Sequence, residues 1–169
     1  GVEGRTRVTR GAQWQVGRDD RGSAFLVSAN VDGRPNFGGT PSDESLIQAI
    51  RSLKQRGFSV TLYPFLMMDA PGFPWRGRIS STLDKSASVR GAITSFFGTA
   101  QTRDFSLGAG ESHHRATDDG YRNFILSHAN LARRAGGVDR FLIGAEMKGL
   151  TRLRDAGNAF PAVEALMNL

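Results

Sequence analysis

The chain has 169 residues, 39% of them hydrophobic, which is enough to bury the core of one ordinary domain. Lys and Arg number 22 against 16 Asp and Glu, but the arginines are scattered, a pattern more typical of a solvated surface than of a nucleic-acid groove. Cysteine is absent, which excludes disulfides and thiolate chemistry, and no apolar run approaches the roughly 18 residues of a membrane span.

Residues 1–22 are rich in Gly, Arg and Asp and predict an extended surface segment or a short hairpin, whereas 24–29 (AFLVSA) predict a strand. The chain starts at Gly1 without a methionine and stops at Leu169 inside a predicted helix. We therefore expect a piece of a longer polypeptide.

Residues 40–57 carry the clearest helix pattern, with Thr40 as N-cap, Pro41 in the first turn and an apolar face at helical spacing. A strand is predicted directly after it, over 58–67, with pairing that ends or bulges near Pro64. A helix feeding a strand in this way indicates an α/β fold of the doubly wound or barrel kind.

Asp69 follows the end of this predicted strand, and the next loop carries Trp75, Arg76 and Arg78. An aromatic ring beside two guanidinium groups could stack on a sugar and bind an anionic or hydroxylated ligand. Alternatively, Trp75 covers the core and the arginines cap helix carbonyls or pair with Asp69.

Two further helices are predicted, over 84–98 with Asp84 as N-cap and over 117–136. His128 falls on the apolar stripe of the second of these and is interpreted as a hydrogen-bonded core histidine. The adjacent His113 and His114 diverge in direction and have no third ligand at suitable spacing, so no metal site is predicted.

Residues 138–146 contain the apolar run Phe141 to Ile143 and then Glu146. This pattern predicts a strand buried on both faces with a carboxylate at its carboxyl end, where parallel α/β folds place ligand-binding and catalytic groups. Glu146 could instead simply open the next helix as a first-turn acid. A short helical turn over 148–154 and a last helix from Phe160-Pro161 complete the predicted elements.

Five phrases occur in order: FGGTPSDESLIQAI, VTLYPFLMMD, PWRGRIS, YRNFILSHANLARRAGGVDRFLIGAEMKGLTRLRD and FPAVEAL. From about Phe37 onward they resemble the TIM-barrel-like domain of the large tail or host-specificity proteins of gene transfer agents and related phages of alphaproteobacteria. The resemblance implies part of a glycoside-hydrolase-like (β/α)8 barrel over 37–169, preceded by an extended or loosely structured segment, 1–36. A whole barrel of this kind needs roughly 250 residues.

In that family Glu146 belongs to a motif usually read as Gly-Ser-Glu, and here Ala145 replaces the serine, so the carboxylate is kept and a hydroxyl is lost. The resemblance implies that Glu146 is the general acid/base of glycoside hydrolysis, a reaction that generally needs two carboxyl groups. The second is either Asp69 or, as we favour, an acid beyond Leu169. Tyr63 joins Trp75, Arg76 and Arg78 as a candidate substrate-binding residue.

The same resemblance implies a component of a phage-like particle tail that acts at the recipient cell surface. Its partners would be a cell-envelope glycan, either polysaccharide or peptidoglycan, and other tail or baseplate proteins. The alternative is a non-catalytic structural or carbohydrate-binding barrel. Nucleic-acid binding rests only on the formal charge of +6 and is not favoured, and no cofactor or metal is expected.

Overall fold

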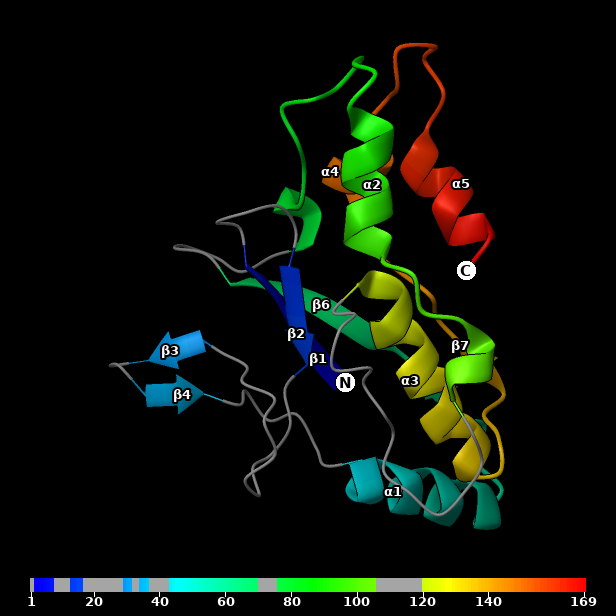
Figure 1. Ribbon diagram of the computed structural model, residues 1–169. Helices are drawn as coiled ribbons and strands as arrows, with labels where there is room; N and C mark the ends of the chain where they lie inside the picture. The colour runs from blue at the N-terminus through cyan, green and yellow to red at the C-terminus, as the bar shows by residue number, and fades with distance from the viewer. Residues whose placement is uncertain are drawn as a thin grey trace.

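The computed structural model describes seven parts of the chain, residues 2–7, 13–16, 29–31, 34–36, 43–69, 76–105 and 120–169 (Figure 1). The strands are β1 (Val2–Arg7), β2 (Gln13–Val16), β3 (Ala29–Val31), β4 (Arg34–Asn36), β5 (Thr61–Leu62), β6 (Pro64–Asp69) and β7 (Arg140–Phe141). The α-helices are α1 (Asp43–Gln55), α2 (Val89–Phe97), α3 (Tyr121–Arg134), α4 (Lys148–Thr151) and α5 (Pro161–Met167), and two 3-10 turns are η1 (Arg76–Arg78) and η2 (Thr102–Asp104).

The strands that organise the fold run parallel. β5 and β6 are one extended segment interrupted at Tyr63, and the two halves have different partners. β5 pairs in parallel with β7, and β6 pairs in parallel with β1, beginning with Pro64 opposite Val2. Parallel neighbours therefore follow one another in chain order, with α1 between β1 and β5 and with α2 and α3 between β6 and β7. This is α/β architecture.

The N-terminal residues form a hairpin, as one of the two sequence interpretations predicts, because β1 also pairs antiparallel with β2. The parallel pairing of β1 with β6 was not predicted and attaches this hairpin to the sheet. β3 and β4 form a second hairpin, on the left in Figure 1. The predicted strand 24–29 lies outside the described residues except for Ala29, the first residue of β3.

Two apolar clusters hold the helices against the strands. In the larger one the rings of Phe96, Tyr121 and Phe124 pack in series, with Tyr121 stacked on Phe96 at 5.4 Å between ring centroids. In the smaller one α1 contributes Ile47 and Ile50, which pack with residues of β5 and the end of α3. Figure 1 shows the result, with α1 beside the lower end of α3 and α2 beside α5.

The junction between α2 and α3 depends on a glycine. A Cβ built on Gly120 would lie 2.4 Å from the Cα of Gly98 and 2.5 Å from the carbonyl oxygen of Phe97. No side chain fits there, so the backbone at the end of α2 meets the backbone at the start of α3 directly.

The helix predicted over 84–98 begins five residues later than expected, at Val89. Asp84 is not its N-cap, because its carboxylate accepts hydrogen bonds from the backbone and side chain of Arg154. Lys85 has a left-handed φ of 61°, and Ser86 forms an isolated parallel bridge with Asp155. A left-handed residue cannot continue a right-handed helix, so the segment before Val89 joins the C-terminal loop instead.

The prediction of a strand buried on both faces over 138–146 is wrong in extent and in burial. β7 has two residues, and the side chains that follow are exposed, Leu142 by 39% and Ile143 by 41%. Among the described strands β7 pairs with β5 alone, so one edge of it has no strand beside it.

The remaining helix predictions agree with the structure. α1 and α3 fall inside the predicted ranges, α4 lies within 148–154, and α5 begins at Pro161. His128 is buried on α3, with its Nδ1 2.6 Å from the carbonyl oxygen of Phe124, which confirms the core-histidine interpretation. Within the described residues, no helix is long and apolar enough to cross a membrane.

Candidate functional site

Arg76, the first residue of η1, is the centre of a polar cluster between two parallel strands. Its Nε donates a hydrogen bond to the carbonyl oxygen of Ala145 at 2.8 Å, and its Nη2 donates one to the Tyr63 hydroxyl at 2.8 Å. The same Nη2 forms an ion pair with Oε2 of Glu146 at 2.9 Å. Only 12% of the Arg76 side chain is exposed, so this guanidinium is fixed by the fold.

Tyr63 stands at the break between β5 and β6 and contributes its ring as well as its hydroxyl. The guanidinium carbon of Arg76 lies 5.8 Å from the centroid of the Tyr63 ring, within the range of a cation–π interaction. Tyr63 is half-buried, so part of the side chain remains in contact with solvent.

Glu146 lies five residues after the end of β7 and has a left-handed backbone, with φ of 55°. This region is uncommon for a residue with a Cβ and costs about 1–3 kcal/mol, so it persists only where the surroundings impose it. Here the Arg76 bond to Ala145 fixes the preceding carbonyl, and the ion pair fixes the carboxylate. The Glu146 side chain is nevertheless 58% exposed, so its charge is presented to solvent.

Tyr121 on α3 supports the segment that leads to Glu146. Its side chain is buried, and its hydroxyl donates a hydrogen bond to the carbonyl oxygen of Ile143 at 2.9 Å. Burial raises the pKa of Tyr121 well above its ordinary value, with Tyr63 adding to the rise and Arg76 opposing it. Tyr121 therefore stays a neutral donor through the physiological range.

Three of the six predicted site residues are brought together, namely Tyr63, Arg76 and Glu146. Arg78 lies at the other end of η1 and is exposed. Asp69 ends β6 opposite Arg7, but its side chain, like Trp75, His113 and His114, lies outside the described residues. The alternative in which the arginines cap helix carbonyls does not describe this bond of Arg76, because its acceptor, the carbonyl oxygen of Ala145, lies in the loop after β7.

Tyr121 was missed as a site residue by sequence reasoning. Its position on the apolar stripe of α3 accounts for the burial of its ring, but it gives no information about which group its hydroxyl contacts. Buried tyrosines generally find a hydrogen-bond partner, and that rule alone would have prompted a search for one.

The cluster offers one exposed carboxylate, one fixed guanidinium and one phenol. These groups suit the hydroxyl groups of a polar ligand, which donate to carboxylates and accept from arginine. Within the described side chains, no group of three His, Cys, Asp or Glu residues could hold a metal ion. Glycoside hydrolysis would require a second carboxyl group about 5–9.5 Å from Glu146.

Comparison with known families bears on the C-terminal part of the chain. Residues 119–169 match the family model of the GTA TIM-barrel-like domain, where GTA stands for gene transfer agent. The GTA match covers α3, β7, α4 and α5, and it includes Tyr121 and Glu146 of the cluster. No curated protein matches the chain. The match connects this segment with a domain family named after gene transfer agents.

Proposed function

We propose that this chain is part of a (β/α)8 barrel in the tail of a gene transfer agent particle and that it binds glycan of the recipient cell envelope. The observation that carries the proposal is the cluster of Tyr63, Arg76 and Glu146, which gathers side chains from three segments next to parallel strands. Ligand sites of parallel α/β folds are built from the segments that follow the strands.

The strand order supports the barrel part of the proposal. β1 pairs in parallel with β6, and β5 pairs in parallel with β7, with helices in the connections. Extending this arrangement to eight parallel strands in total closes a barrel. The match of residues 119–169 to the GTA TIM-barrel-like domain supports the assignment to a gene transfer agent particle. The particle, its tail location and the cell-envelope target are the parts that we propose.

Glycan binding fits the chemistry of the cluster. Glu146 can accept hydrogen bonds from sugar hydroxyls, and Arg76 holds its carboxylate in one position. The Tyr63 ring offers a face for the apolar side of a sugar. A fixed guanidinium loses little side-chain entropy when the ligand arrives, which favours binding.

Hydrolysis of the same glycan is a second candidate, favoured by the backbone of Glu146. Left-handed non-glycine residues concentrate at active sites, and this one presents an exposed carboxylate. Catalysis would also need Asp69 or an acid outside this chain as the second carboxyl group. Without that partner, the cluster would only bind.

Binding is tested with the expressed chain and with insoluble peptidoglycan sacculi and capsular polysaccharide from an alphaproteobacterial recipient. Arg76→Ala should weaken retention about tenfold, because it removes the group that fixes Glu146. Arg103→Ala is the matched control, since it removes the same charge from an exposed position on η2. Equal retention of the Arg76 variant and the wild type would exclude the cluster as the glycan site.

Hydrolysis is tested on the same material by release of new reducing ends. If Glu146 is catalytic, Glu146→Gln should abolish release while retention falls only modestly. Retention without any release selects the non-catalytic function, and release that survives Glu146→Gln removes Glu146 from the mechanism.

A further inference from the structure

A second polar groove lies next to the cluster, between the segment that follows η1 and the stretch from α4 to the start of α5. Its volume is about 540 Å³, enough for one or two sugar rings. The residues that matter for its chemistry are Ser80, Ser81, Asp84, Arg152, Arg154 and Phe160. η1 carries Arg76 at one end and packs against α4, whose Gly149 lines the groove, so the groove and the cluster lie on neighbouring elements.

The two arginines of the groove differ in their partners. Arg154 is neutralised, because its Nη2 lies 2.6 Å from Oδ2 of Asp84 and its Nε lies 3.3 Å from Oδ1. The Arg152 side chain is exposed and forms no hydrogen bond or ion pair with any residue in the described part of the chain. The groove therefore presents one uncompensated guanidinium, which favours an anionic ligand.

Phe160 gives the groove an exposed aromatic ring. The residue is 45% exposed although it directly precedes a buried proline, Pro161. A Phe ring at the surface of a polar groove is suited to stack on the apolar face of a sugar. Opposite it, Ser81 Oγ accepts a hydrogen bond from the Leu83 backbone N–H at 3.1 Å, which leaves the hydroxyl hydrogen available as a donor.

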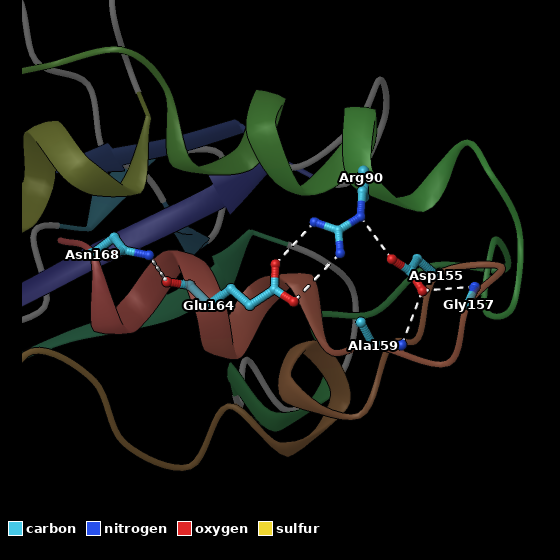
Figure 2. A network of polar contacts seen from close by, with 6 residues as sticks. All are labelled: Arg90, Asp155, Gly157, Ala159, Glu164 and Asn168. Atoms are coloured by element: carbon cyan, nitrogen blue, oxygen red, sulfur yellow. Dashed lines mark hydrogen bonds and ion pairs between the residues drawn. The ribbon is translucent and has the colours of Figure 1, made fainter.

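The loop that carries Phe160 is held in place by Asp155, as Figure 2 shows. The Asp155 carboxylate accepts from the backbone N–H groups of Gly157 at 2.8 Å and Ala159 at 2.9 Å, and it pairs with Arg90 Nε at 2.6 Å. Arg90 also reaches Glu164 on α5. Phe160 follows an anchored residue, so little conformational entropy is lost when a ligand binds.

The two walls of the groove meet in a close approach of their backbones. A Cβ on Gly149 would lie 2.5 Å from the carbonyl oxygen of Ile79 and 2.6 Å from that of Gly77, so α4 rests directly on the η1 segment. The backbone N–H of Lys85 donates to the carbonyl oxygen of Arg154 at 2.8 Å and joins the two walls at the far end.

We propose that this groove binds a sugar that carries an oxyanion, with Arg152 pairing with the anion and Phe160 stacking on the ring. The anion is a carboxylate, as in a uronic acid, or a phosphate on a sugar. The proposal rests on the proposed glycan-binding function and deepens it, because it assigns an acidic class to the glycan.

The test uses the whole chain and three soluble probes, trigalacturonic acid, glucose 6-phosphate and neutral maltotriose, with affinity measured by titration calorimetry. We expect at least one anionic probe to bind and maltotriose to bind at least tenfold more weakly. Arg152→Ala and Phe160→Ala should each weaken the anionic probe about tenfold, whereas Arg103→Ala should leave its affinity unchanged. Both target residues are exposed, so thermal unfolding should confirm that the variants remain folded.

The two anionic probes separate the sources of the charge, since preference for trigalacturonic acid indicates a carboxylate and preference for glucose 6-phosphate indicates a phosphate. The proposal would be overturned if neither anionic probe binds at about 10 mM, a concentration at which even a weak affinity is detected. Wild-type affinity in the Arg152 variant would do the same. Arg76→Ala distinguishes the two sites, because anionic binding that survives it supports the groove even if the cluster binds no glycan.

Discussion

Replacing Tyr121 by Phe removes one hydroxyl from the segment that carries Glu146 and leaves the ring packing in place. The ring is 1% exposed and stacks on Phe96 at 5.4 Å, and Phe preserves both features. The loss is therefore one hydrogen bond, of 2.9 Å to the carbonyl oxygen of Ile143. A net hydrogen bond contributes about 0.5–1.5 kcal/mol, and an acceptor left without a partner adds to the cost.

Ile143 is 41% exposed, so water can partly replace the lost hydrogen-bond donor. The total loss of stability should therefore lie near the lower end of the expected range. We expect Tyr121→Phe to lower the free energy of unfolding by about 1–2 kcal/mol and Tm by about 2–8 °C. By contrast, Tyr121→Ala should cost about 3–5 kcal/mol, because the ring contacts are lost as well.

The assay is urea unfolding followed by circular dichroism, with the m value as a check that the unfolded state is unchanged. A Tyr121→Phe variant as stable as the wild type, at equal m, would show that the hydroxyl does not support Ile143. Alkaline pH gives a second readout. Burial raises the pKa of Tyr121, so its contribution to stability is intact below pH about 10 and is lost as pH rises toward the folded-state pKa. The difference between wild type and variant should shrink over that range.

Three further changes test other parts of the fold. Gly149→Ala should destabilise the fold by about 1–3 kcal/mol, because its Cβ would meet two backbone oxygens. Gly91→Ala on α2 is the control, since its Cβ would have nothing within 4 Å, and it should be neutral or stabilising by about 0.5–1 kcal/mol. Equal Tm values for the two variants would contradict the close approach at Gly149. The side-chain hydrogen bond from Arg154 holds the pKa of Asp84 at about 2, below the ordinary 3.8. The contribution of Asp84 to stability should therefore be intact above pH about 4 and fall toward pH 2. Asp84→Asn should flatten this part of the acid unfolding curve. Asp155→Ala should lower Tm more than Asp155→Asn, because an amide oxygen still accepts hydrogen bonds from the backbone N–H groups of Gly157 and Ala159. The reverse order of Tm values would show that the charge of Asp155 matters more than these two hydrogen bonds.

The local sequence pattern was sufficient to predict the helices that bury one apolar face. The apolar spacing of α1 and α3 predicted both helices, and Ile47, Ile50 and Phe124 are buried as that spacing requires. α2 was predicted too long because Asp84 resembles an N-cap in sequence. Its actual partner, Arg154, lies 70 residues away, and no local pattern reports a contact over that separation.

Three residues of the candidate site were predicted from the sequence, but their geometry was not. Glu146 and Arg76 were singled out separately, one after a strand and one on a loop, and their ion pair followed from neither position. Pairing was expected to end or bulge near Pro64. The pairing of β5 with β7 does end at Leu62, but Pro64 then opens β6, whose partner strand is β1. That change of partner is a property of the sheet, so residues 58–67 alone could not reveal it.

The open side of β7 has a consequence for strand pairing. In a parallel ladder alternate residues face opposite sides, and the Leu142 N–H donates to Leu62, so the backbone groups of Phe141 and Ile143 face the side where no described strand lies. Half-exposed Leu142 and Ile143 flank that edge. Edges of this kind are the places where a further strand can pair. The Tyr121 hydroxyl already occupies the Ile143 carbonyl, and it thereby removes one of the acceptors that an incoming strand would need.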